Sequence, residues 1–135
     1  MNNEFYEYVE DVAICLYSLA ESYEETDAYT YIDCIPTAML ALHRIAQSLD
    51  IDIKWDIIAK KLNSARPAIR YTVDEAERII AMLREALYHR NIDVVENLVY
   101  EIYTSLAKSI EALTTVEVGV HTEGEAVQSI EVTIS

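Results

Sequence analysis

The stretch that decides the fold class is FYEYVEDVAICLYSLAESY, residues 5–23. Its large apolar side chains recur at alternating steps of four and three residues, which places them on one face of a helix of about five turns. They are Phe5, Val9, Val12, Leu16, Leu19 and Tyr23. Acidic residues gather in the first turns, where the helix dipole favours negative charge. The pattern predicts an amphipathic helix whose apolar stripe packs inside a helical bundle.

Two further helices are predicted after this one. Residues 24–33 have no clear period and are interpreted as a connector. Pro36 is well placed as the first residue of a helix that ends near Asp50, and its apolar stripe is Met39, Leu42, Ala46 and Leu49. Asp52 is the expected cap of a short third helix. The predicted inner face of that helix is Trp55, Ile58 and Leu62.

The second half of the helical region carries clearer boundary signals. Pro67 disfavours helical geometry at the residue before it, so the chain is expected to break between 63 and 71. Thr72-Val-Asp-Glu75 matches a capping box and predicts a helix that runs to about Arg90. Asn91 is the expected cap of a fifth helix. Its stripe is Val95, Leu98, Ile102, Leu106, Ile110 and Leu113.

After residue 114 the apolar pattern changes from the period of a helix to the alternation of a strand. Val116, Val118 and Val120 alternate with other residues, and a second alternating run follows at 130–134. Gly124 can supply the turn between them. The sequence therefore predicts a mainly α single domain over 1–135. It consists of a bundle of about five helices over 1–113 and a C-terminal β-hairpin over 115–135.

Composition narrows the class of protein. Hydrophobic residues make up 52% of the 135, with two Gly and two Pro, which is typical of a packed domain. The acidic N-terminus is unlike a signal peptide, and charge-free runs such as 12–20 are too short to cross a bilayer. We therefore expect a cytoplasmic protein without membrane contact. Cys15 and Cys34 lack the spacing of a zinc site, and their pairing in a disulfide is left open. No metal and no cofactor are expected.

The net charge of −14 is unevenly distributed. Residues 1–53 and 93–135 are strongly acidic, while 54–92 hold eight of the ten basic side chains. Two interpretations remain open. The basic segment either pairs with its acidic flanks or forms a patch for phosphate or an acidic partner. The candidate patch residues are Lys54, Lys60, Lys61, Arg66 and Arg70. A sequence pI of about 4.4 disfavours nucleic acid, because the rest of the surface repels phosphate.

Residues 58–73 resemble a helix-turn-helix of DNA-binding proteins. Ala59, Asn63 and Ile69 occupy the places of the small, turn and branched apolar residues of that motif. The resemblance implies that Arg66 and Arg70 belong to a recognition helix near the major groove. The capping box at 72–75 favours the alternative, a basic turn between two core helices.

Arg84 and His89 are spaced as in the Arg-x(4–6)-His signature of HEPN-type helical ribonucleases, which the segment resembles. The resemblance implies that His89 is a general acid or base and that Arg84 stabilises phosphate charge. Five residues of helix separate two side chains by about 140°, so they converge only if the helix ends between them. The alternative is a solvated last turn of a helix.

The function predicted from the sequence is that of a non-enzymatic helical protein–protein interaction or oligomerisation module. A lone hairpin is marginal in water, so we expect a homo-oligomer to which the hairpin or the first helix contributes. A different protein partner remains possible. Nucleic-acid binding through 54–90 and the ribonuclease are the alternatives.

Overall fold

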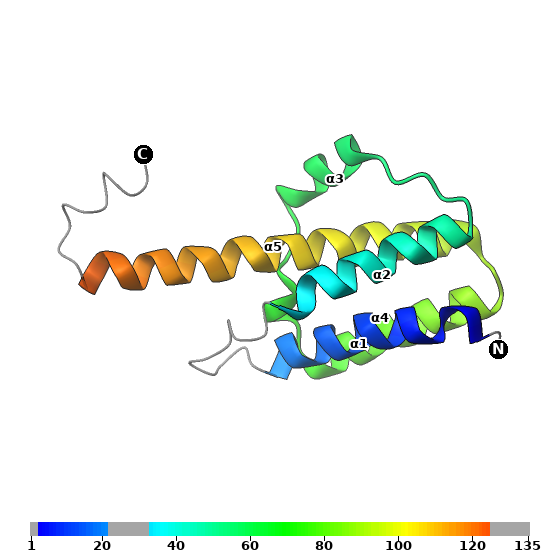
Figure 1. Cartoon of the computed structure of the whole chain (residues 1–135), viewed down its shortest axis with the longest axis horizontal. Coiled ribbons are helices and arrows are strands. Elements are labelled where there is room, and N and C mark those ends of the chain that lie inside the picture. Colours follow the sequence, from blue (N-terminus) through cyan, green and yellow to red (C-terminus); the bar gives the residue numbers. More distant parts are fainter. Residues whose placement is uncertain (1–2, 22–32, 125–135) are drawn as a thin grey trace.

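The computed structural model describes residues 3–21 and 33–124, and the side chains of 4–21 and 33–113. Over these ranges it is helical (Figure 1). A 3-10 turn at Asn3–Phe5 leads into α1 (Tyr6–Glu21), and α2 spans Cys34–Ser48. The short α3 covers Trp55–Leu62, and a second 3-10 turn, η3, covers Ala68–Arg70. Helix α4 spans Val73–Tyr88 and α5 spans Ile92–Gly124.

Four of these helices form a bundle. α1 packs against α2 and α4, and α5 packs against the same two, so that α1 and α5 are diagonal to each other. The α1 stripe predicted from the sequence is confirmed, because its members are at most 2% exposed: Phe5, Val9, Val12, Leu16 and Leu19. The α5 stripe is also buried, except for the half-buried Ile110. Tyr23 and the predicted connector at 24–32 lie outside the described residues.

The smaller elements close one side of the bundle. α3 packs on α5, and η3 lies between α1 and α5. Ser109 of α5, which is fully buried, accepts a hydrogen bond from the backbone N–H of Ile69 (3.1 Å) and donates one to the carbonyl of Ser105 (2.9 Å). The capping box is confirmed: Glu75 N–H donates to Thr72 Oγ1 (3.0 Å), and Thr72 N–H donates to Glu75 Oε1 (2.9 Å). Local bonds therefore fix the path from α3 into α4.

A disulfide joins the first two helices. Cys15 in the middle of α1 pairs with Cys34 at the start of α2, with 5.4 Å between their Cα atoms. The two cysteines are 19 residues apart in the sequence, and the undescribed residues 22–32 lie between them. The disulfide therefore closes a loop that contains this segment.

Three local predictions need correction. α2 begins at Cys34, so Pro36 is its third residue. α3 has Lys54 at its N-cap without a side-chain cap bond, while Asp52 pairs with the Lys54 ammonium at 3.5 Å. Trp55 is not on an inner face: it is 58% exposed, because the burial of α3 centres on Ile58.

The predicted β-hairpin is not supported. α5 continues as helix through Gly124, over the residues predicted to form the first strand, and the second strand lies outside the described residues. The spacing of Leu113, Val116 and Val120 explains the difference, since it continues the three- and four-residue period of α5 as well as it fits a strand. At 33 residues, α5 is about 50 Å long and extends well past the other helices (Figure 1).

Candidate functional site

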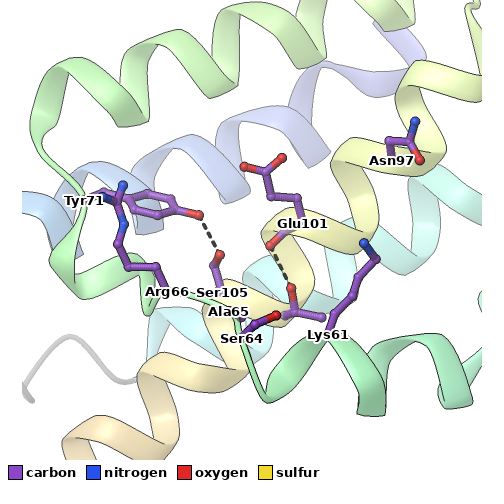
Figure 2. A pocket seen from close by; sticks show the side chains of 9 residues that line it. Lys61, Ser64, Ala65, Arg66, Tyr71, Asn97, Glu101 and Ser105 are labelled. Atoms are coloured by element: carbon purple, nitrogen blue, oxygen red, sulfur yellow. Dashed lines mark hydrogen bonds between the residues drawn. The ribbon is translucent and has the colours of Figure 1, made fainter.

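A pocket of about 490 Å³ lies between α3, the segment that joins α3 to α4, and α5 (Figure 2). α5 contributes Asn97, Glu101, Thr104 and Ser105, and α3 and the following segment contribute Lys61, Ser64, Ala65, Arg66 and Tyr71. The pocket is therefore built from two separate parts of the chain, 61–71 and 97–105. Its lining is mainly polar and includes both signs of charge.

Arg66 is held in place at one end of this pocket. Its guanidinium pairs with Glu75 at 2.7 Å and stacks over the Tyr71 ring at 4.8 Å from the ring centre. The hydrogen bond from Arg66, helped by the backbone N–H of Thr72, lowers the pKa of Glu75 below its ordinary value. Glu75 is therefore ionised at neutral pH and neutralises Arg66.

Tyr71 forms the buried wall beside Arg66. The ring is 5% exposed, and its hydroxyl shares a hydrogen bond with Ser105 of α5 (Figure 2). Burial, reinforced by the nearby carboxylate of Glu101, raises the pKa of Tyr71 above its ordinary value. Tyr71 is therefore neutral at physiological pH, and it anchors this end of the pocket to α5.

Three polar side chains face the same pocket without such partners. Lys61 reaches from the last turn of α3 toward α5, while Asn97 and Glu101 project from successive turns of α5 (Figure 2). None of the three side chains forms a hydrogen bond or an ion pair with the part of the chain that the structure describes. An ammonium, an amide and a carboxylate are thus available to a ligand from a single pocket.

The predicted basic patch is only partly assembled. Lys61 and Arg66 line the pocket together, Lys54 lies at the other end of α3, Lys60 is exposed on α3, and Arg70 is in η3. Acidic side chains already pair with Lys54 and Arg66. The sequence analysis missed Asn97 and Glu101, because single polar residues on a long helix resemble an ordinary solvated face. Ser105, a small polar residue on the buried face of α5 that also lines the pocket, was the available signal.

The segment that the helix-turn-helix resemblance assigns to a recognition helix is not a continuous helix. Pro67 is extended, η3 lasts three residues, and Tyr71 is extended again before α4 begins. Arg66 and Arg70 therefore lie on a turn, as the capping box indicated. Ala59, which the motif would bury, is exposed on α3.

Arg84 and His89 have different partners. Arg84 pairs with Glu10 of α1 at 3.7 Å, whereas His89 contacts Glu85 at 3.0 Å. Helix α4 ends at Tyr88, but the C-cap residue His89 still has helical backbone angles, so the chain does not turn between Arg84 and His89, and the two side chains contact different partners.

The outer face of α4 carries a second candidate surface. Six exposed residues occupy a stripe about 100° wide: Asp74, Arg78, Ala81, Met82, Glu85 and His89. Beside them lies a hollow of about 490 Å³ with a mainly apolar lining, to which Ala86 and Val94 contribute. Met82 is 46% exposed and lies in the middle of this stripe.

Other classes of site find no support within the described ranges. They contain no group of three or more side chains able to hold a metal ion. His43 instead contacts the Tyr103 hydroxyl at 3.3 Å and the ring of Trp55.

None of the described helices is long and apolar enough to span a membrane. Comparison with family models, with curated protein sequences and with solved structures finds no match for this chain.

Proposed function

We propose that this chain is a non-enzymatic self-association module, and that two copies dock through the outer face of α4. The observation that carries the proposal is the order of charges along that face. From its N-terminal end the stripe reads acidic, basic, apolar, apolar, acidic, and then the imidazole of His89. This order is complementary to itself when it is reversed.

An antiparallel pair of α4 helices makes use of this complementarity. A two-fold axis between Ala81 and Met82 places Arg78 of one copy opposite Glu85 of the other, and the same contact recurs on the other side of the axis. Two turns from the axis, Asp74 lies opposite His89. Each charged position on the stripe therefore faces either a charge of opposite sign or the imidazole of His89.

The apolar centre of the stripe supplies the packing. In this arrangement Met82 of each copy lies over Ala81 of the other, beside the hollow lined by Ala86 and Val94. Methionine is flexible and fills irregular gaps, so it suits a hollow of this kind. The face is one helix wide, which is small for a permanent dimer. We therefore expect reversible association.

The α4 face, and not the apolar stripe of α1, is the exposed surface that can take part in self-association. The stripe of α1, which was expected to contribute to assembly, is buried inside each copy. The α4 face is exposed in full, and Arg78 forms no ion pair with any described residue.

The test is the molar mass of the full chain, measured by light scattering and sedimentation over a wide concentration range. Self-association that increases with concentration and is abolished by Met82→Glu is expected. Leu40→Glu is the matched control, because Leu40 is also a half-exposed apolar residue (52%) but lies on α2, diagonal to α4. A parent chain that stays monomeric throughout, or a dimer that is disrupted by Leu40→Glu and not by Met82→Glu, overturns the proposal.

A further inference from the structure

We infer that the pocket between α3 and α5 binds a small zwitterion, a molecule that carries an ammonium and a carboxylate group, such as a free amino acid or a dipeptide. This site is separate from the α4 face and does not depend on self-association. It rests on the identity of the side chains that line the pocket and on which of them already have partners.

The charges inside the pocket select this class of ligand. Arg66 is neutralised by Glu75 at 2.7 Å, so it adds little net charge. Lys61 and Glu101 remain, one cation and one anion, and they do not pair with each other although both line the same pocket. A ligand carboxylate near Lys61 and a ligand ammonium near Glu101 satisfy both charges at once.

The same balance argues against a simple anion. Phosphate bound by Lys61 would lie in the same pocket as the carboxylate of Glu101, which repels it. A simple cation bound by Glu101 would meet the ammonium of Lys61. Asn97, one turn before Glu101, offers both a donor and an acceptor to the polar atoms between the two ends of a zwitterion.

The walls of the pocket are rigid where the ligand needs them. The Tyr71 hydroxyl shares a hydrogen bond with Ser105 (Figure 2). Thr104 donates to the backbone carbonyls of Tyr100 (2.9 Å) and Glu101 (3.1 Å). A volume of about 490 Å³ lies within the range of ordinary ligand sites and accommodates a dipeptide. The two groups that would move on binding are the long side chains of Lys61 and Glu101.

Isothermal titration calorimetry of the full chain with dialanine tests the inference. Saturable binding is expected, together with a loss of about tenfold or more in affinity when the amine is acetylated or the carboxylate is amidated, since each change removes one charged contact. Inorganic phosphate is the competing probe. Phosphate that binds more tightly than dialanine, or dialanine that does not bind at all, overturns the inference.

Single variants test which side chain binds the carboxylate of the ligand and which binds its ammonium group. Lys61→Gln is expected to remove the preference for the free carboxylate and to keep the preference for the free amine, and Glu101→Gln is expected to do the reverse. Lys60→Gln and Glu96→Gln are matched controls on the same helices, and neither residue lines the pocket. All four positions lie on the helix surface, so thermal melts of the variants should match the parent. Equal effects of Lys60→Gln and Lys61→Gln contradict the assignment.

Discussion

Reversal of the charge at Arg78 is the sharpest test of the proposed α4 contact. An exposed ion pair contributes about 0.5 kcal/mol, and a like-charge pair costs a similar amount. The Arg78→Glu variant therefore changes each contact with Glu85 by about 1 kcal/mol. Because the two-fold axis repeats the contact, the dimer loses about 2 kcal/mol, which corresponds to an increase of about 30-fold in the dissociation constant.

The double variant Arg78→Glu with Glu85→Arg restores the complementarity with the signs exchanged. Its dissociation constant is expected to return to within about threefold of the parent value, and a double-mutant cycle by sedimentation equilibrium measures the coupling. Lys60→Glu makes the same change in net charge on α3 and reports the general repulsion between acidic copies. The reasoning is refuted if the double variant stays as weak as Arg78→Glu, or if Lys60→Glu weakens the dimer as much.

Three further predictions concern the fold and are read from thermal or denaturant unfolding. Ser109→Ala leaves the buried N–H of Ile69 without an acceptor and is expected to cost about 1–3 kcal/mol, whereas Ser48→Ala on the exposed end of α2 should cost far less. The pKa of Glu75 is lowered in the folded chain, so its contribution is present above the ordinary carboxyl pKa and is lost as the pH falls through the folded value. Glu75→Gln keeps a capping-box residue but loses the charge facing Arg66, and its destabilisation at pH 7 should disappear in acid. Reduction of the disulfide, whose loop has a sequence separation of 19, is expected to cost about 3 kcal/mol, and a lack of effect would show that the α1–α2 packing alone fixes that pair of helices.

The helices with strong local signals were predicted correctly from the sequence. The stripe of α1, the capping box at Thr72 and the cap at Asn91 all depend on residues within a few positions of one another. Asn91 accepts the N–H of Val94 at 3.4 Å, as a cap should. Such signals are decided by local geometry, so the rest of the chain does not need to be known.

Local signals did not decide two other predictions, the structure of the residues after 114 and the first residue of α3. Alternating valines after residue 114 satisfy a strand pattern, and at steps of three and four they also satisfy a helix pattern. The continuation of α5 through Gly124 follows the long packed helix before it, because extending an existing helix adds one hydrogen bond per residue without the cost of nucleation. Asp52 is a good capping residue, but Lys54 occupies the N-cap and α3 starts at Trp55.

Features that depend on contacts between distant parts of the chain could not be predicted from the sequence alone. The pairing of Cys15 with Cys34 requires the positions of two helices relative to each other. The pocket likewise joins Lys61 to Asn97 and Glu101, and charge counting had found only the first of these. Arg66 was correctly singled out as basic, but its pairing with Glu75 shows that a count of charges overestimates what a segment offers to a ligand.

The fold separates the basic residues of 54–92 into those with an internal role and those available to a partner. Within the described part of the chain, Lys54, Arg66, Arg84 and Arg90 form ion pairs with acidic side chains. Arg84 pairs with Glu10 of α1, and Arg90 pairs with Glu4 of the 3-10 turn that precedes α1. Each pair is 30–90% exposed at its side chains and therefore contributes little by itself. Neither Lys61 nor Arg78 has an acidic partner among the described residues, and each lies beside a hollow. In so acidic a protein, an unneutralised cation next to a concave surface is the feature that a ligand or a second copy can recognise, so these two positions carry the two proposals.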